Sequence, residues 1–322
     1  MDPVSVSVVV PTIGRESLQR TVDSLAAAHG PLPERILLVD DRLAGPLPVR
    51  IPARLAGRVT VLAGPGRGPA AARNTGWTAA ASEWIAFLDD DVTVGPHWHD
   101  ELAADLAQAG QAVAGVQGRL HVPMPADRAP TDWERSVAGL ETAQWATADM
   151  AYRRSALAET GGFDERFTIA YREDADLALR IMDRGHILKL GARHTTHPVR
   201  PAPWWISLRT QAGNSFDPLM DRLHGPGWRE RAGVPRGRRT RHLAITLAGC
   251  AGLAAAATGH RRLATVALAG WAAGTAEFAA ARIAPGPHTP AELATMALTS
   301  AVLPPVAVAQ WIRGVVRYRG SA

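Results

Sequence analysis

Three adjacent carboxylates directly follow a strongly apolar segment, and this junction restricts what the chain can fold into. Residues 84–88 (WIAFL) have the length and composition of a buried strand, and Asp89, Asp90 and Asp91 come next. Burying unpaired carboxylates is costly, so such a strand has to end where the charges are neutralised. A divalent cation prefers carboxylate oxygen and often bridges to the phosphates of a substrate. The junction therefore predicts a metal site for a phosphorylated ligand at the carboxyl end of a strand.

The N-terminal part alternates between short apolar runs and helical patterns. Strands are expected at residues 4–10, 35–41, 59–62 and 84–88, with helices at residues 17–29 and 69–81. This alternation is typical of βαβ units with a mostly parallel sheet. Ligands of such sheets bind beyond the carboxyl ends of the strands. Residues 12–15, 40–41 and 89–91 all follow expected strands, so we expect them to meet at one edge of the sheet.

The rest of this α/β domain carries weaker patterns. Helices are expected at residues 96–108 and 173–184, and strands at residues 112–117, 146–152 and 187–190, the last of them at an edge of the sheet. We therefore expect a first domain at residues 1–200 and a Pro- and Arg-rich connector at residues 201–242. An Ala-rich, apolar helical region is expected at residues 243–322.

Long uncharged runs mark the C-terminal region. Residues 243–259 and 293–312 contain no charged residue, and the second run has about the length of a membrane span. Pro304 and Pro305 are expected to kink a helix there. Three spans would place residues 260–262 opposite the cluster at residues 236–241, and the basic C-terminal end opposite that cluster too, which conflicts with the positive-inside rule. A helical hairpin or an interfacial association is therefore expected, with a soluble alanine-rich bundle as the alternative.

Arginines give the chain a net charge of +5, and they gather at residues 229–241 and near the C-terminal end. Their apolar neighbours favour anionic lipid over nucleic acid as a partner. The single cysteine, Cys250, excludes an intrachain disulfide and a cysteine-based metal site. The N-terminal residues lack the pattern of a signal peptide. We therefore expect the N-terminal domain to lie in the cytoplasm.

Six short motifs resemble those of family 2 glycosyltransferases, in the same order and with similar spacing. They are residues 8–15 (VVVPTIGR), 38–41 (LVDD), 70–76 (AAARNTG), 87–91 (FLDDD), 161–164 (GGFD) and 173–177 (EDADL). Each motif alone is weak, but six in order are specific, and the resemblance covers about residues 4–200. It implies the GT-A fold, which is a Rossmann-like, mostly parallel sheet flanked by helices. It also implies the transfer of a sugar, with inversion, from a nucleotide-diphospho-sugar to an acceptor hydroxyl.

The resemblance assigns a divalent metal ion, Mn²⁺ or Mg²⁺, to the acidic junction. Asp91 is its expected ligand together with Asp89, and His197 matches a histidine that completes the metal shell in several relatives. A cation at this place would neutralise the negative charge that develops on the leaving diphosphate. In the alternative, the acids only cap a loop or a helix, which explains one or two carboxylates but not three.

The resemblance also implies a donor site. Its expected residues are Pro11, Thr12, Arg15, Asp40, Arg73, Asp89 and Asp90. Asp40 matches the acid that accepts a hydrogen bond from the nucleotide base, and a UDP-sugar is the donor expected first. Arg73 is expected to contact the phosphates or the base. The alternatives are a helix N-cap for Asp40, a solvated side chain for Arg15, and for Arg73 an internal salt bridge such as one to Asp89.

Asp174 is the expected general base, because in the family the second acid of this pair deprotonates the acceptor hydroxyl. It begins an expected helix whose dipole stabilises a carboxylate, while the neighbouring charges of Glu173 and Asp176 raise its pKa. Glu173 would orient the base or bind the acceptor. The resemblance places Asp149 on the acceptor side. The alternative for the pair is the ordinary enrichment of acids in the first turn of a helix.

Features outside the motifs bear on the acceptor. Processive relatives carry a Gln-x-x-Arg-Trp motif after the base, and this sequence lacks it, which favours one transfer per encounter. Trp204 and Trp205, beside Arg200 and Arg209, are typical of a membrane interface, or else form a buried pair that closes the acceptor site. We expect a glycan or a polyprenyl- or lipid-linked acceptor in cell-envelope glycan synthesis. The expected location is the cytoplasmic face of the membrane, peripheral or anchored through the C-terminal helices.

Two other functions are weighed against this one. A module that binds nucleotide sugar without turning it over, as a membrane scaffold, would not need the intact pairs Asp89/Asp91 and Glu173/Asp174. Nucleotidyl transfer to a sugar phosphate would need a longer glycine-rich, basic loop than residues 11–15 (PTIGR) after the first strand. Metal-assisted sugar transfer is therefore the leading hypothesis.

Overall fold

The computed structural model describes residues 4–42 and 49–320 and divides into two compact units. The first, which we call the sheet unit, comprises Met1–Pro123, Ala138–Val199 and Trp228–Val234. The second, which we call the helical unit, comprises Met124–Val137, Arg200–Gly227 and Pro235–Ala322. The alternative of a helix beginning after Asp40 falls on residues 43–48 and lies outside the described residues.

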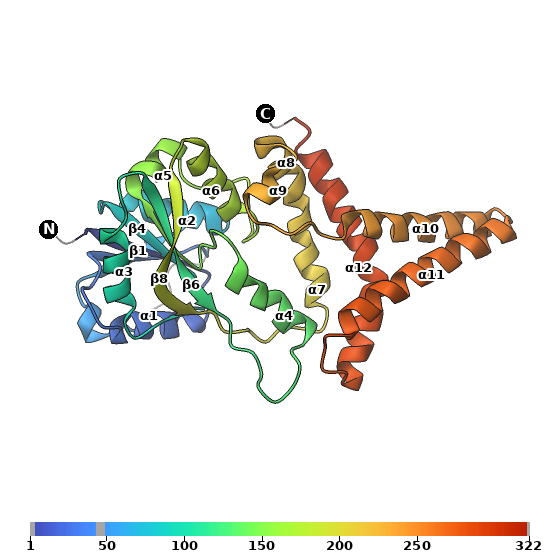
Figure 1. The fold of residues 1–322 in the computed structure, drawn as a ribbon, viewed down its shortest axis with the longest axis horizontal. Coiled ribbons are helices and arrows are strands. Elements are labelled where there is room, and N and C mark those ends of the chain that lie inside the picture. Colours follow the sequence, from blue (N-terminus) through green and yellow to red (C-terminus); the bar gives the residue numbers. More distant parts are fainter. Residues whose placement is uncertain (1–3, 43–48, 321–322) are drawn as a thin grey trace. The chain divides into compact units, whose positions relative to one another are not determined.

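An eight-stranded sheet forms the centre of the sheet unit (Figure 1). Its strands are β1 (Val6–Thr12), β2 (Arg35–Asp40), β3 (Val59–Ala63), β4 (Trp84–Leu88), β5 (Thr93–Val94), β6 (Val113–His121), β7 (Asp149–Arg153) and β8 (Ile187–Thr196), in the order β3-β2-β1-β4-β7-β6-β8-β5. β1 is parallel to β2 and β4, and β2 is parallel to β3, so the carboxyl ends of these four strands share one edge. β7 is antiparallel to β4 and β6. The expected mixed, mostly parallel α/β sheet is confirmed.

Helices cover both faces of the sheet, because successive strand residues point to opposite faces. These helices are α1 (Ser17–Ala27), α2 (Pro69–Ala79), α3 (Trp98–Ala107), α5 (Arg154–Thr160), α6 (Glu173–Asp183) and α9 (Trp228–Arg231), with the 3-10 helices η1 (Ala53–Leu55) and η2 (Gly139–Thr142). Val8 and Val10 of β1 belong to the core with α1 and α3, whereas Val9 belongs to the core with α2 and α6. Gly76 lets α2 approach the sheet closely, since an added Cβ would lie 2.3 Å from Cγ1 of Val9.

β8 is longer than expected, because it continues to Thr196. It is parallel to β6, and only its last two residues pair with the two-residue strand β5, so residues 187–190 pair with β6 alone. The prediction of an edge strand at residues 187–190 is therefore confirmed in position and too short in length. The polar second half of β8 contains Arg193 and Thr195, which are buried with internal hydrogen-bond partners, and hydrophobic periodicity does not detect such residues.

The helical unit contains a helical hairpin and a long C-terminal helix. Its helices are α4 (Asp132–Ala138), α7 (Ile206–Arg209), α8 (Asp217–His224), α10 (Arg239–Ala257), α11 (Arg261–Ile283) and α12 (Pro290–Arg317), with the 3-10 helix η3 (Thr210–Phe216). α10 and α11 run antiparallel beside each other, as Figure 1 shows. α12 continues as one helix through Pro304 and Pro305. The expected helical character of the C-terminal region is confirmed.

Within the described residues, two helices are long and apolar enough to cross a membrane, judged by length and composition alone. They are α11 and α12. The core helices of soluble proteins can be equally long and apolar, so length and composition alone do not show that α11 and α12 contact lipid.

Candidate donor and catalytic site

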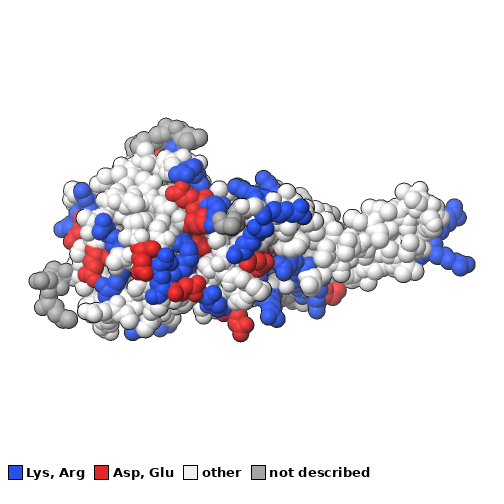
Figure 2. All heavy atoms as spheres, turned by 90° about the horizontal axis from the view of Figure 1, so that it is seen from above, with Lys and Arg blue, Asp and Glu red and all other residues white. Residues whose placement is uncertain are grey.

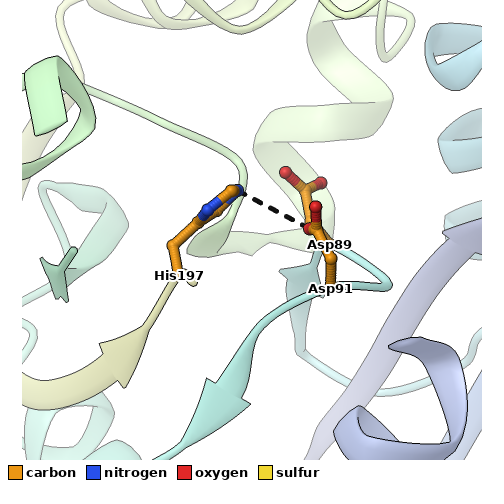
Figure 3. Close-up of side chains that lie close together, drawn as sticks. All are labelled: Asp89, Asp91 and His197. Carbon is orange, nitrogen blue, oxygen red and sulfur yellow. Dashed lines mark ion pairs between the residues drawn. The ribbon is translucent and has the colours of Figure 1, made fainter. Parts of the chain in front are cut away.

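Asp89, Asp91 and His197 lie together at the carboxyl edge of the sheet, and we call them the metal-ligand cluster (Figure 3). One potential ligand atom of each residue lies within 4.8 Å of the others, and Nε2 of His197 is 3.6 Å from Oδ1 of Asp91. The two acids follow β4, and the histidine follows β8. Asp91 and His197 are buried. Nδ1 of His197 has no hydrogen-bond partner among the described residues.

This set of side chains fits a divalent cation. Two carboxylates and an imidazole are ligands that suit Mn²⁺, and carboxylates also suit Mg²⁺. Nε2 of His197 faces Asp91, so the imidazole presents this nitrogen to the place where the two carboxylates would hold a cation. The fold therefore brings together the two acids of one motif and the histidine predicted from outside the motifs.

Arg73 lies between the metal-ligand cluster and the acids that begin α6. Its Nη2 donates a hydrogen bond to Oδ1 of Asp89, and its Nη1 donates one to Oε1 of Glu173, both at 2.9 Å. Its guanidinium also lies over the ring of Phe163. The side chain is only 3% exposed. Direct contact of Arg73 with the donor is therefore not supported, because the structure shows the internal salt bridge instead.

Burial perturbs both acids at the start of α6. Loss of hydration raises the pKa of Glu173 to about 7, with a further increase from the charge of Asp174 and an opposing effect of Arg73. Burial also raises the pKa of Asp174, against a backbone hydrogen bond from Ala175 and the positive charges of Arg73 and Arg172. Asp174 retains part of its surface exposed to solvent. A partly exposed carboxylate with a raised pKa has the properties that a general base needs.

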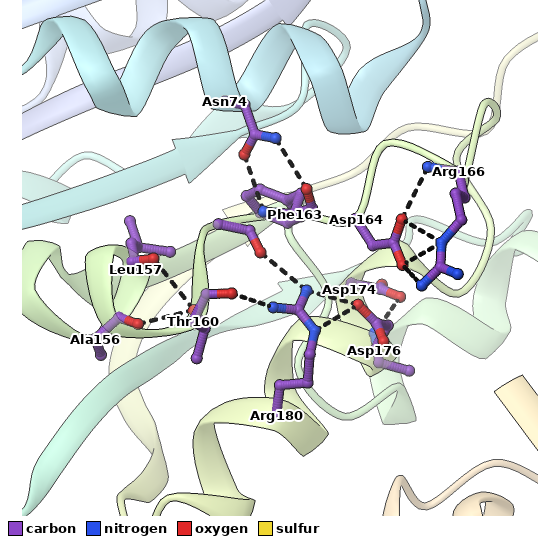
Figure 4. A network of polar contacts seen from close by, with 12 residues as sticks. Asn74, Ala156, Leu157, Thr160, Phe163, Asp164, Arg166, Asp174, Asp176 and Arg180 are labelled. Carbon is purple, nitrogen blue, oxygen red and sulfur yellow. Dashed lines mark hydrogen bonds and ion pairs between the residues drawn. The ribbon is translucent and has the colours of Figure 1, made fainter. Parts of the chain in front are cut away.

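The third acid of α6, Asp176, has a structural role. It is completely buried and accepts hydrogen bonds from Nε and Nη2 of Arg180 at 2.9 and 2.6 Å. Arg180 also donates to the backbone oxygen of Gly162, and Asn74 of α2 bonds the backbone N–H and C=O of Phe163 (Figure 4). These hydrogen bonds fasten the loop that follows α5 to α2 and α6. The GGFD motif therefore belongs to a loop that supports the site.

Arg172, which precedes the acids Glu173 and Asp174, has a left-handed backbone conformation with a φ of 75°. This conformation is uncommon for a residue with a side chain, and the surrounding contacts have to maintain it. The guanidinium of Arg172 lies over the ring of Tyr171 at 4.3 Å and near the ring of Trp228 at 5.1 Å. Trp228 is completely buried and belongs to the third segment of the sheet unit. Stacking on these rings thus helps to fix the point where α6 begins.

On the donor side, Thr12 and Arg15 both bond to Asp90. Oγ1 of Thr12 and Nη1 of Arg15 each donate to one carboxylate oxygen of Asp90 at 2.6 Å. Asp90 is 1% exposed, so it ties the turn after β1 to the end of β4, and direct donor contact is not supported. Pro11 is buried within β1 and acts as a strand residue. Thr12, Arg15 and Asp40 line a cavity of about 210 Å³ at the ends of β1 and β2.

The two acids after β2 have different roles. Asp40 is buried, and its Oδ1 accepts a hydrogen bond from Nε of Arg42 at 2.8 Å. A nucleotide base would therefore have to share this carboxylate with Arg42. Asp41 accepts hydrogen bonds from the backbone N–H groups of Gly66 and Gly68, both at 2.7 Å. Asp41 thus fixes the glycine-rich turn before α2, a role that the sequence analysis missed.

These residues lie in a segment that can be compared with known families. The family model described as "Glycosyl transferase family 2" matches residues 7–176, which is more than half of the chain. The chain belongs to glycosyl transferase family 2. The resemblance carried by the six motifs is confirmed, and Asp89, Asp91, Glu173 and Asp174 of the glycosyltransferase lie inside the matched segment.

Curated relatives of this glycosyltransferase agree with the family. The pre-mycofactocin glycosyltransferases of two Mycobacterium tuberculosis strains, CDC 1551 / Oshkosh and ATCC 25618 / H37Rv, are each 30% identical over 237 residues. These matches cover 67% of this chain and 48% of the relatives, so the chain spans about half their length. The succinoglycan biosynthesis protein ExoO of Rhizobium meliloti (strain 1021) is 36% identical over 102 residues, covering 31% of this chain and 28% of ExoO.

A solved structure shares the fold. It is the mannosyltransferase PcManGT from Pyrobaculum calidifontis in complex with GDP-Man and Mn²⁺. The TM-score is 0.51 at 18% identity, over 98% of this chain and 87% of that one. The expected GT-A-like architecture is confirmed by this match.

One predicted site residue of the glycosyltransferase lies away from solvent. Asp149 is completely buried; its Oδ2 accepts hydrogen bonds from Trp98 at 2.8 Å and Thr195 at 2.6 Å, and its Oδ1 accepts one from Arg193 at 2.8 Å. Contact of Asp149 with an acceptor is therefore not supported, because its surface is enclosed and both oxygens are engaged. Its charge neutralises the buried guanidinium of Arg193.

The two adjacent tryptophans of the glycosyltransferase are exposed. Trp204 is 59% exposed and Trp205 is 41% exposed. The alternative in which they form a buried pair is therefore wrong. The tryptophan that does lie near Glu173 and Asp174 is Trp228, which contacts the preceding residue, Arg172. The sequence analysis missed Trp228, although an isolated aromatic residue within an Arg-rich segment is a signal that could have indicated it.

Proposed function

We propose that the protein transfers a sugar, with inversion at the anomeric carbon, from a nucleotide-diphospho-sugar to an acceptor hydroxyl. One observation carries this proposal. The guanidinium of Arg73 donates hydrogen bonds both to Asp89 of the metal-ligand cluster and to Glu173, the acid next to Asp174. A site for the leaving diphosphate and a site for the base thus lie on two sides of one side chain. Direct displacement needs these two groups to be held together.

Asp174 is the proposed general base. The acceptor oxygen forms a bond to the anomeric carbon while the bond from this carbon to the diphosphate oxygen breaks. The proton of the hydroxyl moves to the carboxylate of Asp174, whose pKa burial raises, and the electron pair leaves with the nucleoside diphosphate. Glu173, paired with Arg73 beneath it, is the proposed positioning residue for the start of α6.

Asp89, Asp91 and His197 are the proposed ligands of a divalent ion, Mn²⁺ or Mg²⁺. Such an ion, when bound, stabilises the negative charge that develops on the departing diphosphate. The chain prepares this site, since Arg73 fixes one oxygen of Asp89 and burial restricts Asp91 and His197.

The cavity lined by Thr12, Arg15 and Asp40 is the proposed nucleoside site. Asp90 holds Thr12 and Arg15 from behind, and Asp40 offers a carboxylate to a base N–H. A UDP-sugar is the donor to test first. GDP-mannose is the second, because the structurally similar mannosyltransferase is in complex with GDP-Man.

The proposed acceptor is a glycan or a polyprenyl- or lipid-linked sugar at the cytoplasmic face of a membrane. The exposed Trp204 and Trp205 at the start of α7 are of the kind that lies at headgroup depth. ExoO, named for succinoglycan biosynthesis, supports a glycan acceptor. The missing Gln-x-x-Arg-Trp motif supports a single transfer per encounter.

Calorimetric titration of UDP, GDP and dTDP, with and without Mn²⁺, tests the donor site. We expect one nucleotide to bind with Mn²⁺ and to lose at least tenfold in affinity in Asp91→Ala. The matched control is Asp183→Ala, at the exposed end of α6, which should bind as the wild type does. No nucleotide binding by folded protein under any of these conditions would contradict the proposal. Binding without any sugar turnover would instead support the scaffold function.

A further inference from the structure

The α10–α11 hairpin of the helical unit exposes large apolar side chains along its length. Exposed leucines and valines occur on both helices, namely Leu243, Leu247, Leu253, Leu263 and Val266. The most apolar stretch of α11 is only 11% buried inside the protein, whereas the most apolar stretch of α12 is 39% buried. A soluble helix of this length would normally bury one face against a core. The hairpin therefore lacks a partner for most of its surface among the described residues.

The charges of the hairpin lie only at its two ends. No Asp, Glu, Lys or Arg occurs between Arg241 and Arg261, or between Arg262 and Glu277. Figure 2 shows the same pattern at the right of the view, where a surface without charge ends in basic side chains. At the base of the hairpin, Glu277 is paired with Arg238 and Arg241. The net charge at each end of the hairpin is thus positive, which complements anionic lipid headgroups.

The length of the hairpin approaches the thickness of a bilayer. α10 has 19 residues and α11 has 23, and α10 is not one of the two helices that length and composition alone identify. Their uncharged parts, residues 242–257 and 263–276, are roughly 24 and 21 Å long at 1.5 Å per residue, so the arginine side chains that flank them must extend to the headgroups of a bilayer whose hydrocarbon core is about 30 Å thick. Apolar residues occur on all sides of both helices, whereas a helix that lies flat in the interface needs one polar face. This distribution favours crossing over lying in the interface.

The two helices pack through small residues, as helices in membranes do. An added Cβ on Gly252 would lie 2.7 Å from Leu268, and one on Gly274 would lie 2.7 Å from Ile245. Hydroxyl groups in the hairpin bond to backbone oxygens one turn earlier, as Thr246 does to His242. Such hydrogen bonds satisfy polar groups without water.

α12 is held in a different way. Arg282, at the end of α11, is buried; its Nη2 bonds Asp132 of α4 at 2.7 Å, and its Nη1 bonds Thr299 and Ser300 of α12 at 2.8 and 3.0 Å. These charged and polar contacts attach α12 to α4 at the base of the hairpin. A helix fixed to a charged cluster in this way is a poor lipid-facing span.

We infer that α10 and α11 cross a lipid bilayer as a two-span hairpin, with residues 258–262 on the far side and α12 remaining on the near side. Four arginines at the base, at residues 236, 238, 239 and 241, outnumber Arg261 and Arg262 at the tip, which agrees with the positive-inside rule. An even number of spans also returns the basic C-terminal end to the side of the base. The inference does not depend on the proposed sugar transfer.

The single cysteine provides the test, because Cys250 is exposed near the middle of α10. The full chain is reconstituted into sealed phosphatidylethanolamine/phosphatidylglycerol vesicles and treated with a charged, membrane-impermeant maleimide. Two further variants carry Cys250→Ala with one new cysteine, either His260→Cys at the tip or Ala79→Cys on the exposed surface of α2. The Ala79→Cys protein reports the fraction of molecules whose sheet unit faces outward.

We expect His260→Cys to be labelled only in the fraction of molecules that Ala79→Cys leaves unlabelled, and both variants to be labelled fully once the vesicles are permeabilised. Cys250 should stay unlabelled in the bilayer and react only after denaturation in detergent. Labelling of His260→Cys as fast as Ala79→Cys, with Cys250 protected, would overturn the crossing in favour of a shallow insertion. Free labelling of Cys250 in protein that stays with the soluble fraction would overturn the lipid contact altogether, and a dimer in solution would then identify a second copy as the partner.

Discussion

Arg73 and Glu173 form a buried ion pair, with Nη1 of the arginine 2.9 Å from Oε1 of the glutamate. The same guanidinium is 2.9 Å from Asp89 through its other amino group. This arrangement couples the acid that begins α6 to an acid of the metal-ligand cluster, although neither residue's motif indicates the other. The stability and the activity of the site should therefore depend on Arg73 even without direct contact with a substrate.

Replacing Arg73 by methionine should lower the free energy of unfolding by about 3–5 kcal/mol, because the buried Glu173 and the partly exposed Asp89 lose their counter-charge. Arg67→Met is the matched control, since the ion pair of Arg67 with Glu165 is exposed, and such a pair is worth at most about 1 kcal/mol. Urea unfolding at pH 7 in EDTA measures both variants. Equal effects of the two substitutions would show that the buried bridge is not formed.

The raised pKa of Glu173 should make the protein less stable as the pH rises. Its pKa is 4.5 when unperturbed and about 7 in the folded protein, so the native state binds more protons than the unfolded state between these values. The free energy of unfolding should fall between about pH 4.5 and 7, by an amount on the order of 3 kcal/mol if Glu173 acted alone. Glu173→Gln should flatten this part of the pH profile. Urea unfolding in EDTA from pH 4.5 to 8 gives the comparison, and parallel slopes for both proteins would refute the assignment.

His197 should be needed for metal binding and His194 should not. His197→Ala removes one potential ligand of the cluster, so we expect at least a tenfold loss in Mn²⁺ affinity. His194→Ala is the matched control, because His194 lies three residues earlier and is exposed. Electron paramagnetic resonance of free Mn²⁺ measures both affinities. Unchanged binding by His197→Ala would place the metal elsewhere or leave Asp89 and Asp91 as its ligands.

Asp149 should matter for stability and not for donor recognition. Asp149→Asn removes one of the two carboxylates that pair with the buried Arg193, while Asp105 remains 3.1 Å from its Nη1, so we expect a loss of about 1–3 kcal/mol. The exposed Asp127→Asn should change stability by less than about 0.5 kcal/mol. Thermal unfolding measures the cost, and nucleotide titration below the unfolding temperature should give the wild-type affinity. A stable variant that has lost acceptor turnover would restore Asp149 to the acceptor site.

The sequence predicts the sheet and the edge where the site lies, because apolar strands that end in acids are local patterns. Asp89 and Asp91 come from one motif and His197 lies outside the six motifs, yet they meet as expected once β4 and β8 take their places in the sheet. Glu173 and Asp174 also begin a helix, as their acidic side chains and the spacing of the following apolar residues indicate. Such features depend on residues that are neighbours in the chain or on the order of parallel strands.

The partners of individual charges could not be predicted in this way. Whether Arg73 contacts a substrate or the acids Asp89 and Glu173 depends on how closely α2 approaches the sheet, which Gly76 determines. Asp90 and Asp149 match acidic positions of the family, but tertiary contacts with Arg15 and Arg193 enclose them. The position of Trp228 depends on the segment Trp228–Val234, which belongs to the sheet unit although the preceding residues Arg200–Gly227 belong to the helical unit. Three-dimensional proximity of this kind leaves no periodic signal in the sequence.

Turnover by Asp174→Asn tests the central claim most directly. Release of nucleoside diphosphate from the best-binding nucleotide sugar is measured with Mn²⁺, with water or an added glycan as acceptor, beside Asp183→Asn as the control at the other end of α6. We expect Asp174→Asn to lose about 10²–10⁴-fold in turnover, which is the contribution of a general base. Its nucleotide affinity should stay within threefold of the wild type. Wild-type turnover by Asp174→Asn would contradict the assignment of the base.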